Sequence, residues 1–137
     1  MANEKLGFVV SDYNADITHL MSKIGQEHAE FLGAKVTKTI RVPGAFDMPL
    51  AVKRLADKKD IQGIVCLGAV IEGDTDHDQI VAHNAARKVV DISVQSGKPV
   101  SLGVSGPKMT RADGVKRIES YAKRSVESAL KMIRRLK

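Results

Sequence analysis

The stretch Gly63–Ile71, GIVCLGAVI, decides the fold class of this 137-residue chain. Its nine residues are all apolar or small, and none carries a charge. A run of this length without polar alternation is typical of a strand that is covered on both faces, as in the middle of a parallel sheet. We therefore expect an α/β protein in which helices shield both faces of this strand.

Upstream of this run, the pattern first predicts one strand and one helix. Leu6–Ser11 is a short β-branched and aromatic stretch that is typical of a buried strand. Asp16 is predicted to cap the helix that follows, and Gly33 to end it. The apolar face of this helix is predicted to hold Ile17, Leu20, Met21, Ile24, Phe31 and Leu32.

A second strand and helix follow before the central run. Val36–Val42 is predicted as a strand, with Val36, Ile40 and Val42 on one face. Asp47 is predicted to cap the next helix, with Pro49 in its first turn, where a missing N–H has no consequence. The apolar stripe of this helix is predicted to be Met48, Ala51, Val52 and Leu55.

Downstream of the central run, the polar loop Glu72–Asp78 leads into a helix predicted from about Gln79 to Ser96, which Gly97 closes. Pro99–Val104 is then predicted as the fourth strand. Strands that alternate with helices indicate a parallel sheet with right-handed crossovers and helices on both faces.

The C-terminal region is predicted to be helical and strongly basic. Thr110 and Asp113 are spaced like a capping box at its start, and Gly114 or Ser120–Tyr121 is expected to divide it. Residues 108–137 hold ten Lys and Arg against three acidic residues, which accounts for the net charge of +6. A nucleic-acid surface is disfavoured, because no Trp, two Tyr and three Phe leave few side chains to stack on bases.

Composition excludes several classes of protein. We expect a single domain over residues 1–137, in the cytoplasm, because the chain shows neither a secretory signal nor an apolar run long enough to cross a membrane. A single cysteine, Cys66, excludes an intrachain disulfide framework. Phosphate-binding lysine loops and G-x-G-x-x-G are both absent from the sequence, so nucleoside triphosphate and dinucleotide sites are unsupported.

Ligands of open parallel sheets bind outside the carboxyl ends of the strands. This rule directs attention to four loops, namely Asp12–Asp16, Pro43–Asp47, Glu72–Asp78 and Ser105–Thr110. The third loop contains His77, between a buried strand and a helix. An imidazole can accept and donate protons near neutral pH, so His77 is a candidate for proton transfer. The pattern supports equally that His77 is a surface residue without a catalytic role.

Metal binding by the third loop is disfavoured. Asp74, Asp76 and Asp78 alternate like the ligands of a calcium loop, but Gln79 stands where that loop needs Gly and Ala85 where it needs Glu. In the second loop, the aromatic Phe46 can either staple onto the helix or face a planar ligand, and Tyr13 and Asn14 in the first loop pose the same question.

Four segments together resemble the lumazine synthase family: Val9–Asn14 (VVSDYN), Val42–Pro49 (VPGAFDMP), Gly68–His77 (GAVIEGDTDH) and Val100–Val104. The resemblance implies a three-layer α/β/α, flavodoxin-like fold with a four-stranded parallel sheet. It also implies that 5-amino-6-ribitylaminouracil condenses with 3,4-dihydroxy-2-butanone 4-phosphate to give 6,7-dimethyl-8-ribityllumazine. Neither a metal nor an organic cofactor is implied.

The same resemblance assigns roles to residues of this chain. His77 matches the proton-transfer histidine, and Asp74 and Thr75 match the loop on the phosphate side. Arg117 is our choice for the phosphate-binding arginine; Lys116 is the alternative, and Arg124 or Lys123 would supply a second cation. The residues implied to contact the ribitylaminouracil are Tyr13, Ala45, Phe46, Asp47, Ala69, Val70, Ile71 and, from a neighbouring subunit, Leu102.

For assembly, the resemblance implies a homopentamer, which can associate further into a capsid of twelve pentamers. Two other functions stay open at this point. One is a riboflavin synthase of the related archaeal type, which should not keep the G-D-T-x-H loop. The other is a non-enzymatic flavodoxin-like module whose basic helix binds nucleic acid.

Overall fold

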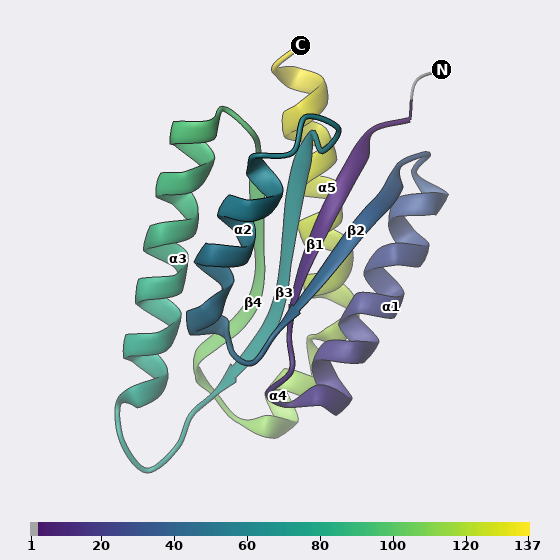
Figure 1. Cartoon of the computed structure of the whole chain (residues 1–137). Coiled ribbons are helices and arrows are strands. Elements are labelled where there is room, and N and C mark those ends of the chain that lie inside the picture. The colour runs from purple at the N-terminus through teal and green to yellow at the C-terminus, as the bar shows by residue number, and fades with distance from the viewer. Residues whose placement is uncertain (1–2) are drawn as a thin grey trace.

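A four-stranded parallel sheet with strand order β2-β1-β3-β4 forms the centre of the molecule (Figure 1). The computed structural model describes residues 3–137, so residues 1–2 of the predicted domain lie outside this range. The strands are β1 (Lys5–Ser11), β2 (Lys35–Val42), β3 (Gly63–Ile71) and β4 (Val100–Met109). β3 has the predicted bounds and pairs with β1 and β4, which explains why its sequence is apolar throughout.

Helices cover both faces of this sheet and create two separate cores. The helices are α1 (Ala15–Phe31), α2 (Met48–Ala56), α3 (His77–Ser96), α4 (Arg111–Lys116) and α5 (Ile118–Arg135). Phe8 and Leu67 belong to the core under α1 and α5, whereas Val9 and Cys66 belong to the core under α2 and α3. This arrangement confirms the predicted three-layer α/β/α fold (Figure 1).

The start of α1 differs from the prediction. Asn14, with φ 62°, is the residue before the helix, so Asp16 lies within the first turn and does not cap it. Asn tolerates this left-handed conformation better than most residues. The Arg111 guanidinium hydrogen-bonds Asp16 and thereby holds the pKa of this carboxyl below its ordinary value.

The predicted apolar face of α1 is only partly correct. Ile17 and Met21 are buried, but Leu20 is half exposed and Phe31 is 83% exposed. Small residues take part of the core-facing side instead: a Cβ on Gly25 would come within 3.1 Å of the Phe8 ring. The helix therefore lies close to the sheet without those two large side chains.

The faces of β2 also differ from the prediction. Val36 packs in the core under α1 and α5, whereas Ile40 and Val42 pack in the opposite core. The pairing of β1 with β2 skips Thr37, and one extra residue moves all later side chains to the other face.

β4 runs to Met109, five residues beyond its predicted end at Val104. Residues Ser105–Thr110 were predicted as a loop, but the strand continues through Gly106 and Pro107, and Met109 pairs again with Ile71 of β3. Gly106 has φ 109°, and a Cβ on it would come within 2.2 Å of the Val70 carbonyl oxygen, so the two strands approach each other unusually closely at this point.

The C-terminal region divides at Arg117, between α4 and α5, and not at either predicted position. Gly114 is buried inside α4. The predicted start is confirmed, because Thr110 Oγ1 accepts a hydrogen bond from the Asp113 N–H at 3.2 Å. Among residues 3–137, every helix is too short or too polar to cross a membrane.

Candidate active site

The carboxyl ends of β1, β2 and β3, together with the start of α3, surround a cavity of about 450 Å³. Because the chain leaves β1 and β3 toward opposite faces of the sheet, this is the crevice where ligands of such folds bind. The residues that line it are Tyr13, Asn14, Gly44, Ala45, Phe46, Asp47, Ala69, Val70, Ile71, Gly73, Thr75, His77, Asp78 and Val81.

The first loop contributes Tyr13 and Asn14. The Tyr13 ring covers Gly44, since a Cβ on Gly44 would come within 2.8 Å of a ring carbon and would displace the ring from this place. Asn14 joins the first loop to β3, because its Nδ2 donates to the Ala69 carbonyl oxygen at 3.2 Å. Its Oδ1 accepts from Arg111 at 3.4 Å, which also connects the loop to α4.

The second loop forms a short 3-10 helix, η1 (Ala45–Asp47), before α2. Asp47 Oδ2 accepts a hydrogen bond from the Gly44 N–H at 3.0 Å and closes this turn. Phe46 is 59% exposed and lines the cavity, so much of its ring remains open to a ligand. Pro49 lies in the first turn of α2, and the predicted apolar stripe of that helix is buried.

One wall of the cavity is apolar and comes from the end of β3. Ala69 and Val70 are buried, and Ile71 is half-buried. Val81 on α3 faces the same cavity. A flat heterocycle bound between this wall and the Tyr13 ring would pack against both.

His77 is the first residue of α3, at the rim of the cavity. Its backbone N–H donates to Thr75 Oγ1 at 3.3 Å, and its side chain is exposed. The next residue, Asp78, is only 7% exposed, and its Oδ2 accepts from the Lys108 N–H of β4 at 3.0 Å. An exposed imidazole on a fixed helix start can accept and donate protons at the cavity.

Three predicted site residues do not line this cavity. Asp74 is exposed in the third loop, and Arg117 lies between α4 and α5. Leu102 of β4 lies instead in a separate hollow of about 350 Å³, which Arg124 also lines. The fourth predicted loop is mostly strand, so the first three loops build the cavity wall.

Five residues that line the cavity were not among the predicted contacts, namely Asn14, Gly44, Gly73, Asp78 and Val81. Asn14 precedes a helix and resembles an ordinary cap, and Asp78 resembles a first-turn acid that stabilises a helix dipole. Only their long-range partners, Ala69 and Lys108, show that they shape the cavity. For Asn14, the sequence indicated its place beside Tyr13 in the first loop and left open whether it faces a ligand.

Other reactive groups lie away from the cavity. Cys66 is fully buried in β3, and burial raises the pKa of its thiol to about 12, so it is no nucleophile. Within residues 3–137, no three His, Cys, Asp or Glu side chains gather closely enough to hold a metal ion.

The sequence profile of the 6,7-dimethyl-8-ribityllumazine synthase family matches residues 3–137. The chain belongs to the lumazine synthase family. A 6,7-dimethyl-8-ribityllumazine synthase of Methanocaldococcus jannaschii is 58% identical over 96% of this chain and 93% of that protein. Proteins of the same name from Archaeoglobus fulgidus and Methanosarcina barkeri are 54% and 57% identical, covering 100% and 96% of this chain and 95% and 97% of theirs.

These relatives favour lumazine synthase over the two other functions that the sequence had left open. Three of the four segments that carried the resemblance meet at the cavity, and Val100–Val104 does not line it. These three, Val9–Asn14, Val42–Pro49 and Gly68–His77, supply the cavity wall. Membership in the lumazine synthase family thus explains why these motifs occur in the sequence and why they lie around one cavity.

Proposed function

We propose that this chain is a 6,7-dimethyl-8-ribityllumazine synthase of riboflavin biosynthesis. It condenses 5-amino-6-ribitylaminouracil with 3,4-dihydroxy-2-butanone 4-phosphate and releases phosphate and two waters. The observation that carries the proposal is the convergence of the family's three motif loops on one cavity that has His77 at its rim. Small-molecule substrates, without metal or cofactor, account for this site.

The shape of the cavity supports the binding of a ribitylaminouracil. The pyrimidine lies between the Tyr13 ring and the apolar wall of Ala69, Val70 and Ile71. The ribityl chain extends along Ala45–Asp47, where a short turn offers backbone groups and the Asp47 carboxylate to its hydroxyls. The small side chain of Ala45 allows close approach to the backbone there.

The chemistry needs proton transfers at each step. The 5-amino group of the uracil attacks the ketone carbon, and water leaves to form an imine. Loss of a proton then gives an enamine, from which the C–O bond to phosphate breaks. After tautomerisation to the ketone, the ribitylamino nitrogen attacks that carbonyl carbon, and loss of a second water closes the ring. His77 takes up and returns these protons at the cavity rim.

Phosphate binding requires a cation that the cavity does not contain. Among the described residues that line it, none is Lys or Arg. Thr75 lines the phosphate side of the cavity, with Asp74 beside it in the exposed third loop, and Arg117 of an adjacent copy supplies the positive charge. Lys116 is the alternative donor, with Arg124 or Lys123 as a second cation; Leu102 of the adjacent copy covers the pyrimidine.

We propose a homopentamer, which the membership in the lumazine synthase family implies. In such a closed ring, one face of each copy joins a different face of the next. The outer side of α3 supports such contacts: Ile80, Val90 and Val94 are 57–78% exposed. Native mass spectrometry should give five times the mass of the 14.9 kDa chain, and sixty times if twelve pentamers form a capsid.

The proposed activity is tested by mixing the purified protein with both substrates. Lumazine is followed by its absorbance and fluorescence, and inorganic phosphate is measured in parallel. We expect both products in equal amounts, well above the uncatalysed rate. Lumazine formation at the uncatalysed rate would contradict the proposal, as would conversion of added lumazine to riboflavin.

A further inference from the structure

The position of the Tyr13 ring depends on the loop that carries it. Tyr13 is 69% exposed, and its ring packs closely on Gly44. The loop backbone is fastened to the end of β2: the Asp12 N–H donates to the Val42 carbonyl at 2.7 Å, and the Tyr13 N–H donates to the Pro43 carbonyl at 2.9 Å. These hydrogen bonds join the first loop to the start of the second.

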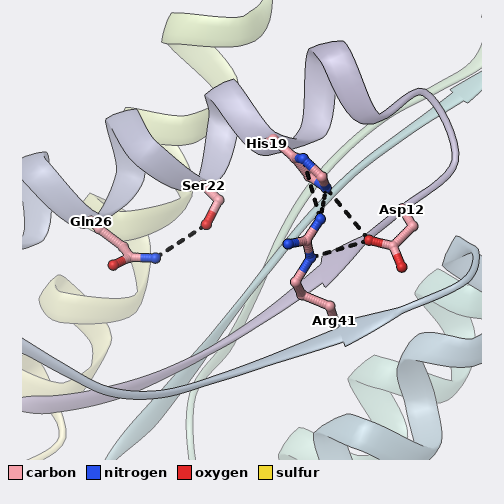
Figure 2. A network of polar contacts seen from close by, with 5 residues as sticks. All are labelled: Asp12, His19, Ser22, Gln26 and Arg41. Carbon is pink, nitrogen blue, oxygen red and sulfur yellow. Dashed lines mark hydrogen bonds and ion pairs between the residues drawn. The ribbon is translucent and has the colours of Figure 1, made fainter.

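A second fastening comes from side chains. Arg41, the last residue but one of β2, donates from its Nε to Asp12 Oδ1 at 3.2 Å. Its Nη2 contacts the His19 imidazole of α1, and His19 Nε2 lies 3.5 Å from the same Asp12 oxygen (Figure 2). Arg41 thus joins β2, the first loop and α1 at one point, directly before Tyr13.

This cluster contributes little to the stability of the fold. The side chains of Arg41, Asp12 and His19 are each about half exposed, and exposed ion pairs are weak. The ends of β1 and β2 are already joined by the sheet, where Ser11 pairs with Val42. What the cluster does fix is the direction in which the chain leaves β1, and so the place of the Tyr13 ring.

We propose that Arg41 is a positioning residue of the pyrimidine subsite: through Asp12 it holds Tyr13 over the cavity. The proposal rests on the proposed function, because it assumes that Tyr13 stacks on the pyrimidine. Arg41 itself lies outside the residues that line the cavity and acts only through the first loop.

The test is a double-mutant cycle between Arg41→Gln and Tyr13→Ala, read out as the dissociation constant of the lumazine product and the KM of each substrate. Arg41→Gln should raise the lumazine dissociation constant and the KM for ribitylaminouracil about 3- to 10-fold, with the KM for the butanone phosphate unchanged. When Tyr13→Ala is already present, Arg41→Gln should change the lumazine dissociation constant by less than about 2-fold, because the ring that Arg41 positions is gone.

The matched control is Lys53→Gln, which removes the cation of an equally exposed pair, Lys53–Asp57 on α2, and should change none of these constants. Three results would overturn the role of Arg41: an unchanged Arg41→Gln variant, an equal loss with and without Tyr13, or no effect of Tyr13→Ala. A wild-type protein that neither binds nor makes lumazine would instead refute the proposed function itself.

Discussion

At the scale of single residues, His77 combines a backbone that is held by a hydrogen bond with a side chain that is exposed to solvent. Its N–H is bound to Thr75 Oγ1, and the neighbouring Asp78 holds the start of α3 to β4. The imidazole remains exposed at the cavity rim. A proton-transfer group needs this combination, because it must meet the substrate at a defined place while still exchanging protons with water.

His77→Gln should therefore lower turnover about 10- to 10³-fold with the fold unchanged, which is the usual contribution of general acid–base catalysis. The measurement is steady-state lumazine formation, accompanied by circular dichroism. His83→Gln is the matched control, since His83 is also exposed on α3 but does not line the cavity. Wild-type turnover of the His77 variant would remove this residue from the mechanism.

The sequence predicted the residues of the site that belong to local motifs. Nine of the predicted contacts line the cavity, including Tyr13, Phe46 and His77, because each lies at a strand end or a helix start that the pattern located. The contacts that Asn14 and Asp78 make were not predicted, because their partners are 55 and 30 residues away in the chain. Local pattern contains no information on such contacts.

At the scale of elements, the bend of β4 is the part of the fold that most depends on a single residue. Gly106 combines φ 109° with a backbone approach to Val70, and Val70 is part of the cavity wall. Gly106→Ala should lower the free energy of unfolding by about 3 kcal/mol or more, since it adds both backbone strain and a clash.

Urea-induced unfolding measures this effect. Gly73→Ala is the control for Gly106→Ala, because a Cβ on Gly73 meets no atom within 4 Å, and its stability should change by less than about 0.5 kcal/mol. Equal stability of the two variants would mean that β4 does not bend against Val70 as described.

An ion pair joins α5 to the residue before β1, with Glu4 buried and the Arg134 side chain about half exposed. Arg134 donates to the Glu4 carboxylate at 2.8 and 3.2 Å, and also to the Leu32 carbonyl at 3.2 Å. Glu4 is only 7% exposed. The hydrogen bonds from the Arg134 guanidinium hold the pKa of the Glu4 carboxyl below its ordinary value of 4.5.

A carboxyl whose pKa is lowered by folding stabilises the protein above its unfolded pKa, and this contribution is lost as the pH falls through the folded pKa. Arg134→Gln should therefore lower the free energy of unfolding by about 1–2 kcal/mol at pH 7. Below about pH 4 the decrease should be smaller, because the Glu4 carboxyl is then increasingly protonated. Urea unfolding of variant and wild type at both pH values tests this. A difference that stays constant, or grows in acid, would exclude the Glu4 pair as its source.

The elements that the sequence predicted well are those whose burial is uniform. β3 is covered on both faces, and α2 has one buried stripe, so their patterns are unambiguous. The errors arise where tertiary contacts override the pattern. Thr37 is an extra residue in β2, Gly25 takes the core-facing place of a large side chain in α1, and β4 continues through Gly106-Pro107.

At the scale of the whole molecule, Arg117, the proposed phosphate ligand, lies apart from the cavity within one described chain. The cavity contains His77 but neither Lys nor Arg, whereas Arg117 lies beyond α4. Leu102 and Arg124 share a hollow of their own. In a closed ring, the surface that carries Arg117, Leu102 and Arg124 in one copy can meet the cavity of the next copy. The two surfaces would then form one site.

Co-assembly of two inactive variants tests this shared site most directly. His77→Gln and Arg117→Gln chains are unfolded together in equal amounts and reassembled, and mass measurement verifies that mixed oligomers form. Random pairing leaves about a quarter of the interfaces with an intact His77 facing an intact Arg117, so about a quarter of wild-type activity should return. Folded oligomers of each variant that are mixed without reassembly should regain none. Activity that stays at the variant level in verified mixed oligomers would contradict the account, because His77 and Arg117 would then not meet across an interface.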